Sequence, residues 1–141
     1  MKRVNLLVLA FLCVMPVASM SQETFTVTGR VNTPSPEGRV YVFLCDRESF
    51  DVPFTGIDTL SYWVNYDKTY VDFEFKNVSA GEYAIRSFQD VNGNHKLDKW
   101  IFGPREPWGF SYSGDMKFPP TFDDVSFDVA YDIRINIVLG K

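Results

Sequence analysis

Apolar and polar residues alternate along most of the chain after residue 22. A period of two predicts strands that place one face on a core and the other in water. Residues 39–45 are apolar at successive positions, which is typical of a central strand covered on both faces. No window shows the three-and-four spacing of an amphipathic helix. The predicted strands are 24–31, 39–45, 61–65 (the weakest), 70–76, 82–89, 125–129 and 132–139.

These short strands are separated by clusters of Pro, Gly, Asn and Asp, the pattern of a two-sheet β-sandwich. A chain of 141 residues fits one domain, since typical domains run to about 100–150 residues. The sequence therefore predicts an all-β, seven-stranded sandwich over residues 20–141. Tyr83 follows Gly81 at the start of a strand, where sandwiches place a tyrosine that hydrogen-bonds back across the corner.

The first 19 residues differ from the rest of the chain. Lys2 and Arg3 precede an apolar run over 6–17, and small residues follow at Ala18 and Ser19. This is the pattern of a secretory signal peptide over 1–19, and the run is too short for a transmembrane segment of about 20 residues. An uncleaved anchor or a buried helix is the alternative. The pattern predicts export to the periplasm, the cell surface or the medium.

Charge and cysteine content exclude several classes of function. Lys and Arg number 14 against 18 Asp and Glu, a net charge of -4 that disfavours nucleic acid as a partner. Cys45 is the one cysteine after the signal peptide and lies in an apolar run, so we expect it to be buried and inert. His95 is the only histidine. A transition-metal site or a Ser-His-Asp triad is therefore not expected, and the sequence shows no catalytic constellation.

An acidic loop over 90–98 is the clearest candidate site. Its oxygen-bearing side chains occupy alternate positions, and Gly93 would let the backbone turn sharply. Calcium prefers about six to eight oxygen ligands, so the spacing predicts a weak calcium site with a main-chain carbonyl near Lys96. It is not an EF-hand, because the glycine and the twelfth position do not match. The predicted ligands are Asp90, Asn92, Asn94 and Asp98.

The same loop also fits a turn that needs no ion. Asn-Gly is a strong turn signal, and Asp or Asn side chains can cap turns through the neighbouring backbone. Lys96 and Lys99 partly offset its two carboxylates. Both interpretations remain open on the sequence.

A long interruption over 90–124 separates the last strands and is rich in aromatic residues. Loops of this length are uncommon in compact domains, and so many rings argue against disorder. The segment is either a ligand surface or a cover that buries its rings on an open end of the sandwich. The candidate ligand-surface residues are Trp100, Trp108, Phe110 and Tyr112.

Four blocks of sequence together resemble a family of exported bacterial proteins known as domain of unknown function twenty-one forty-one. The blocks are Gly81 with Tyr83, the acidic loop 90–98, the segment 104–111 and the segment 119–123. His95 stands where that pattern has a small residue, and Gly103 precedes Pro104 without an intervening residue. The resemblance implies an immunoglobulin-like or transthyretin-like sandwich, similar to the regulatory domain of carboxypeptidases, and no established activity.

We therefore expect an exported, non-enzymatic binding or structural module, stabilised by calcium if the loop binds it and otherwise needing no cofactor. Its partner would be an envelope protein or a glycan. The alternative is a carboxylate-dependent hydrolase or carbohydrate-active protein that uses Asp98, Glu106 and Asp123 in the 90–124 segment. A third hypothesis is a subunit of a surface assembly, joined through an unpaired edge strand.

Overall fold

The computed structural model describes residues 21–101, 103–112 and 119–140. The predicted signal peptide over 1–19 lies outside the described residues. Within them, no helix is long and apolar enough to cross a lipid bilayer.

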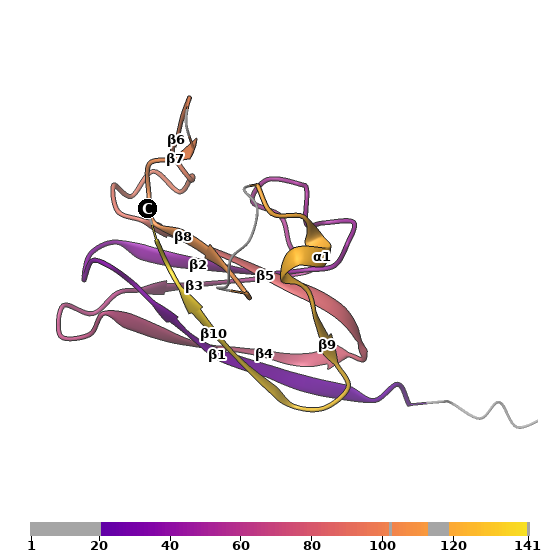
Figure 1. Cartoon of the computed structure of the whole chain (residues 1–141). Coiled ribbons are helices and arrows are strands. Elements are labelled where there is room, and N and C mark those ends of the chain that lie inside the picture. Colours follow the sequence, from indigo (N-terminus) through magenta and orange to yellow (C-terminus); the bar gives the residue numbers. More distant parts are fainter. Residues whose placement is uncertain (1–20, 102, 113–118, 141) are drawn as a thin grey trace, which may run out of the picture.

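Two sheets packed face to face form the molecule, as Figure 1 shows, so the predicted all-β sandwich is confirmed. In the described residues, the smaller sheet has the order β10 (Ile133–Val138), β1 (Thr24–Asn32), β4 (Tyr70–Ser79). The larger has the order β3 (Asp58–Trp63), β2 (Arg39–Cys45), β5 (Gly81–Asp90), β8 (Trp108–Phe110), and β9 (Phe127–Val129) pairs with another part of β5. A ribbon of β6 (Lys99–Trp100) and β7 (Gly103–Pro104) and the short helix α1 (Phe122–Val125) complete the elements.

Each predicted strand corresponds to a strand of the structure, but the count of seven is too low. The segment between β5 and β9 adds β6, β7 and β8 to the elements expected from alternation. These strands have two or three residues each, too few for a period of two to be visible. The predicted strand at 125–129 is also shorter than expected, because Val125 ends α1.

The main core lies between the two sheets and follows the alternation. Phe75, Ile85 and Ile137 are buried there at 0–1% exposure, with polar neighbours of β4 and β10 facing water. Gly29 faces this core too, and a Cβ there would lie 2.4 Å from the Phe73 ring. The glycine thus makes room for an aromatic ring on the neighbouring strand.

Two local expectations from the sequence are confirmed. The Tyr83 hydroxyl donates a hydrogen bond to the Ser79 carbonyl at 3.0 Å, which forms the expected tyrosine corner. Cys45 is a free, fully buried cysteine. Burial raises the pKa of its thiol, and nearby Arg86 offsets this only in part, so the thiol stays protonated near neutral pH.

A second hydrophobic cluster lies on the outer face of the larger sheet. It contains residues of β2 and β5 that point away from the main core, including Phe43 and Phe88. Phe50 from the loop after β2, together with Phe122 and Val125 of α1, packs against them. Figure 1 shows α1 and the β6–β7 ribbon on this outer side. The aromatic segment therefore covers an outer sheet face, and not an open end of the sandwich.

Candidate functional site

Two rows of side chains cross the outer face of the larger sheet. In the first row, Arg86 of β5 lies between Phe43 of β2 and Phe110 of β8 in the strand register. Side chains of residues paired in this way project to the same face. Arg86 is therefore held in the sheet with an aromatic ring on either side.

The second row is adjacent and aromatic throughout. Phe88 of β5 pairs with Tyr41 on one side and Trp108 on the other. The rings of Tyr41 and Phe88 are stacked with centroids 5.1 Å apart, and Trp108 meets Phe110 edge-on at 5.3 Å. Strands of one sheet thus fix these rings from below.

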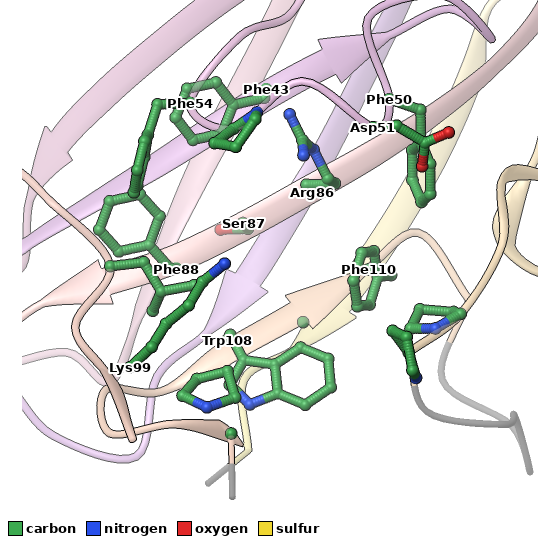
Figure 2. A pocket seen from close by; sticks show the side chains of 17 residues that line it. Phe43, Phe50, Asp51, Phe54, Arg86, Ser87, Phe88, Lys99, Trp108 and Phe110 are labelled. Atoms are coloured by element: carbon green, nitrogen blue, oxygen red, sulfur yellow. The ribbon is translucent and has the colours of Figure 1, made fainter. Parts of the chain in front are cut away.

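A cavity of about 310 Å³ lies above these two rows (Figure 2). The loop after β2 supplies one wall through Phe50 and Phe54, and Pro119 and Pro120 line another part. A volume of this size is at the lower end of the range for small-molecule sites, about 300–1,000 Å³. The cavity is our candidate functional site.

Phe54 is the unusual residue of the wall. Its backbone φ is 55°, in the left-handed region that a bulky side chain rarely adopts. The ring packs edge-on against Phe88 with centroids 5.8 Å apart and remains 45% exposed. Such strained, half-exposed residues are concentrated at ligand clamps and other functional positions.

Of the described residues, three with charged side chains line the cavity: Arg86, Lys99 and Asp51. Figure 2 shows the Arg86 side chain between Phe43 and Phe50. Its guanidinium lies 5.9 and 5.6 Å from those two ring centroids, within cation–π range. Arg86 Nη2 also donates hydrogen bonds to the loop carbonyls of Val52 at 2.8 Å and Thr55 at 2.6 Å. The arginine therefore fixes the loop that forms the cavity wall.

The predicted ligand-surface residues have different locations. Trp108 and Phe110 both line the cavity. Tyr112 is 52% exposed and does not line it. Trp100 belongs to β6, and its side chain lies outside the described part of the structure.

Sequence reasoning missed the sheet residues of the cavity, Phe43, Arg86 and Phe88, and the loop residues Phe50 and Phe54. One signal was available. Residues 39–45 are apolar on both faces of the strand, and a sandwich core covers only one of these two faces. The other face needed a cover, which the sequence alone did not identify.

The acidic loop is closed by its own hydrogen bonds. Asp90 is 1% exposed, and its Oδ1 accepts from the backbone N–H groups of Gly93 and Asn94 at 2.8 and 3.2 Å. Its Oδ2 accepts from the N–H of His95 at 2.8 Å. Gly93 and His95 have φ of 75° and 61°, so the chain turns sharply here, as predicted for Gly93. These bonds satisfy one carboxylate without an ion.

All four predicted calcium ligands lie in this one cluster. The Asp98 carboxylate accepts from the Asn92 amide at 2.7 Å and from the Asn94 amide at 2.9 Å. Over the described ranges, no group of three His, Cys, Asp or Glu side chains could hold a metal, so a site here would need asparagine oxygens. Calcium would replace the amide donors at Asp98, and its binding stays a prediction.

The three acids of the hydrolase hypothesis have different partners. Glu106, 6% exposed, accepts from the backbone N–H groups of Val91 at 3.0 Å and Asp98 at 3.2 Å. Asp123 pairs with Arg47 at 2.6 Å, and this hydrogen bond lowers the pKa of Asp123. Each carboxylate is thus occupied by a contact that holds a loop or α1 in place.

Comparison with known protein families agrees with the motif resemblance. The profile of a family described as an uncharacterized protein conserved in bacteria matches residues 31–136. The chain belongs to the DUF2141 family. The matched range contains the acidic loop, the aromatic segment and all the strands that form the floor of the cavity. No curated protein and no solved structure matches this DUF2141 protein.

Proposed function

We propose that this DUF2141 protein is an exported, non-catalytic binding module that holds a small, largely apolar ligand in the aromatic cavity. The observation that carries the proposal is the cavity of about 310 Å³ over the two side-chain rows of the larger sheet. Ligand sites are mostly concave, apolar and preformed, with few polar groups. Export is inferred from the sequence of residues 1–19.

The cavity walls favour binding over simple cover of the sheet. Phe43 and Phe88 are 5% and 4% exposed, so the floor is closely packed, whereas Phe54 is 45% exposed above it. Aromatic side chains that only covered a sheet would lower their free energy by closing over it, since each ring contributes a few kcal/mol (about 1.5–3) when fully buried. The Phe54 ring, held at φ of 55°, instead contacts the edge of the floor at Phe88 and leaves the cavity beside it open.

A neutral fluorescent aromatic, N-phenylnaphthylamine, tests this proposal. We expect saturable binding with one site per chain. Phe54→Ala should raise the Kd about two- to tenfold, because an aromatic contact contributes about 0.5–1.5 kcal/mol. The matched control is Tyr66→Ala, which removes an aromatic ring that is 80% exposed and outside the cavity. Absence of binding, or an equal loss in both variants, would refute the assignment.

The hydrolase alternative is tested separately on esters and glycans. The engagement of Asp98, Glu106 and Asp123 in separate structural contacts supports binding without turnover. Turnover that Glu106→Gln abolishes, in a variant whose circular dichroism remains native, would overturn the non-catalytic proposal.

A further inference from the structure

The charge of Arg86 is not compensated within the described part of the protein. Arg30, Arg47 and Arg134 have carboxylate oxygens at 2.8, 2.6 and 3.7 Å. Among the described residues Arg86 has no such ion pair, although it is partly buried between aromatic rings. Buried charges in proteins are normally paired, because removing an ion from water is costly. Arg39 also has no ion pair among the described residues and stacks on Trp63, but only Arg86 of the two lines a cavity, where an external anion has room to pair with it.

The hydrogen bonds of the guanidinium are also incomplete. Arginine has five N–H donors, and among the described residues the hydrogen bonds of Arg86 to oxygen use Nη2 only. Its Nε is buried and has no oxygen or nitrogen acceptor among the described residues. The neighbouring thiol of Cys45 is only a weak acceptor. The buried Nε is closed to a ligand, so the capacity for a further, stronger acceptor lies at Nη1.

The other charged residues of the cavity leave its lining with a net positive charge. Lys99 lines the same cavity, is exposed, and has no ion pair among the residues that the structure describes. Figure 2 shows its side chain near that of Phe88. Among the described residues Asp51 is the single acid in the lining, and it too is exposed. The cavity is therefore locally cationic in a chain of net charge -4.

We propose that the ligand of this cavity is an organic anion, an apolar or aromatic body carrying one carboxylate-type or sulfonate-type group. The body packs against Phe88, Phe54 and Trp108, and the anionic group pairs with Arg86, with Lys99 contributing at the rim. This inference rests on the proposed binding function and adds the charge class of the ligand. The mostly apolar lining is unlike a sugar site, which needs many hydrogen-bonding groups.

Two dyes with the same ring system isolate the effect of the charge. N-phenylnaphthylamine is neutral, and anilinonaphthalene sulfonate is the same skeleton with one sulfonate. The folded protein should bind the sulfonate about tenfold or more tighter than the neutral dye, the range for a hydrogen bond to a charged group. Added salt should weaken this preference and leave the neutral dye unaffected.

Variants that remove one charge test whether the preference for the sulfonate dye arises in the cavity. Arg86→Met should bring the ratio of the two affinities to within about twofold of one. Lys99→Gln should reduce it by about two- to fivefold, as expected for an exposed charge. Asp51→Asn should increase it. Arg134→Met, on β10 of the other sheet, is the matched control and should leave the ratio unchanged.

The outcomes separate the two proposals. If neither dye binds, the proposed function fails and this inference fails with it. If the neutral dye binds at least as tightly as the sulfonate, the cavity is a binding site but the anion inference is wrong. A preference unchanged by both Arg86→Met and Lys99→Gln would also overturn it. Arg86 also fixes the loop, so Arg86→Met can fail to fold, which a lost cooperative unfolding transition would show. In that case Lys99→Gln and the salt dependence test the anion inference.

Discussion

Glu106 shows how a single side chain can hold two loops together. Its carboxylate accepts one backbone N–H at the start of the acidic loop, from Val91, and one near its end, from Asp98. The sequence presents Glu106 as one acid among 18, and we considered it there for catalysis. Its contacts depend on residues 8 and 15 positions away, a separation that no local pattern encodes.

Glu106→Gln should therefore destabilise the fold. An amide can offer one acceptor oxygen, but its NH₂ group would face the second backbone N–H and leave it unsatisfied. We expect a loss of about 1–3 kcal/mol in the free energy of unfolding, measured by urea denaturation. Glu48→Gln, the same change at an exposed position, is the control and should be near neutral. Equal stability of the two variants would show that the buried contacts contribute nothing.

The acidic loop is an element whose hydrogen bonds and composition allow two interpretations. Asp90 is satisfied by backbone N–H groups, as in an ion-free turn, whereas the half-buried Asp98 carboxylate accepts from side-chain amides alone among the described residues. Asp98 is consequently the carboxylate on which the predicted calcium binding depends most directly.

Calcium at 10 mM should raise the melting temperature if the loop binds it with a Kd near the weak end of extracellular sites, roughly 1 mM. Binding to the folded state alone would then add about 1.4 kcal/mol, or several degrees. Asp98→Asn should remove the shift, and magnesium at equal concentration is the control. Identical melting curves in calcium and in chelator would leave the ion-free turn as the correct interpretation.

Helix α1 is held on the outer cluster partly by charge. Arg47 from the loop after β2 contacts Asp123 of α1 at 2.6 Å and Glu82 at 3.3 Å. The hydrogen bond and charge of Arg47 place the pKa of Asp123 below its ordinary value. The folded state therefore binds the proton less tightly than the unfolded chain. The resulting stabilisation exists above the ordinary carboxyl pKa of about 3.9 and disappears as the pH falls through the lower, folded-state pKa.

Arg47→Gln should accordingly reduce stability near neutral pH and have progressively less effect below about pH 3.9. Thermal unfolding of wild type and variant across this range measures the difference, and added salt should diminish it. Lys96→Gln serves as the control, since this exposed lysine has no ion pair among the described residues. A difference that is constant with pH would exclude the Asp123 pair as its source.

At the scale of the whole molecule, the described domain begins at β1 almost directly after the predicted cleavage site. Thr24 starts β1, and the predicted signal peptide ends at residue 19. The sheets also end in edge strands, with β3 on the larger sheet and β4 and β10 on the smaller. Assembly through such an edge remains a hypothesis.

Expression of the full chain in a bacterium tests export. We expect a product in the periplasmic or extracellular fraction whose mass lacks the first 19 residues. Leu9→Asp, which places a charge in the apolar run, should retain the unprocessed chain inside the cell. An unprocessed product from the wild-type sequence would favour the anchor or buried-helix alternative.

The sequence by itself determined the strands of six or more residues, the core face of those that alternate, the sandwich class, the tyrosine corner and the buried cysteine. All of these follow from alternation or from residues close together in the chain, and alternation is a local property of extended backbone. The aromatic cavity was decided by tertiary structure. Phe43, Arg86 and Phe110 meet only because β2, β5 and β8 pair in one register, and Phe54 reaches them from a separate loop. Register and loop packing depend on contacts between distant residues, which a pattern along one chain does not contain.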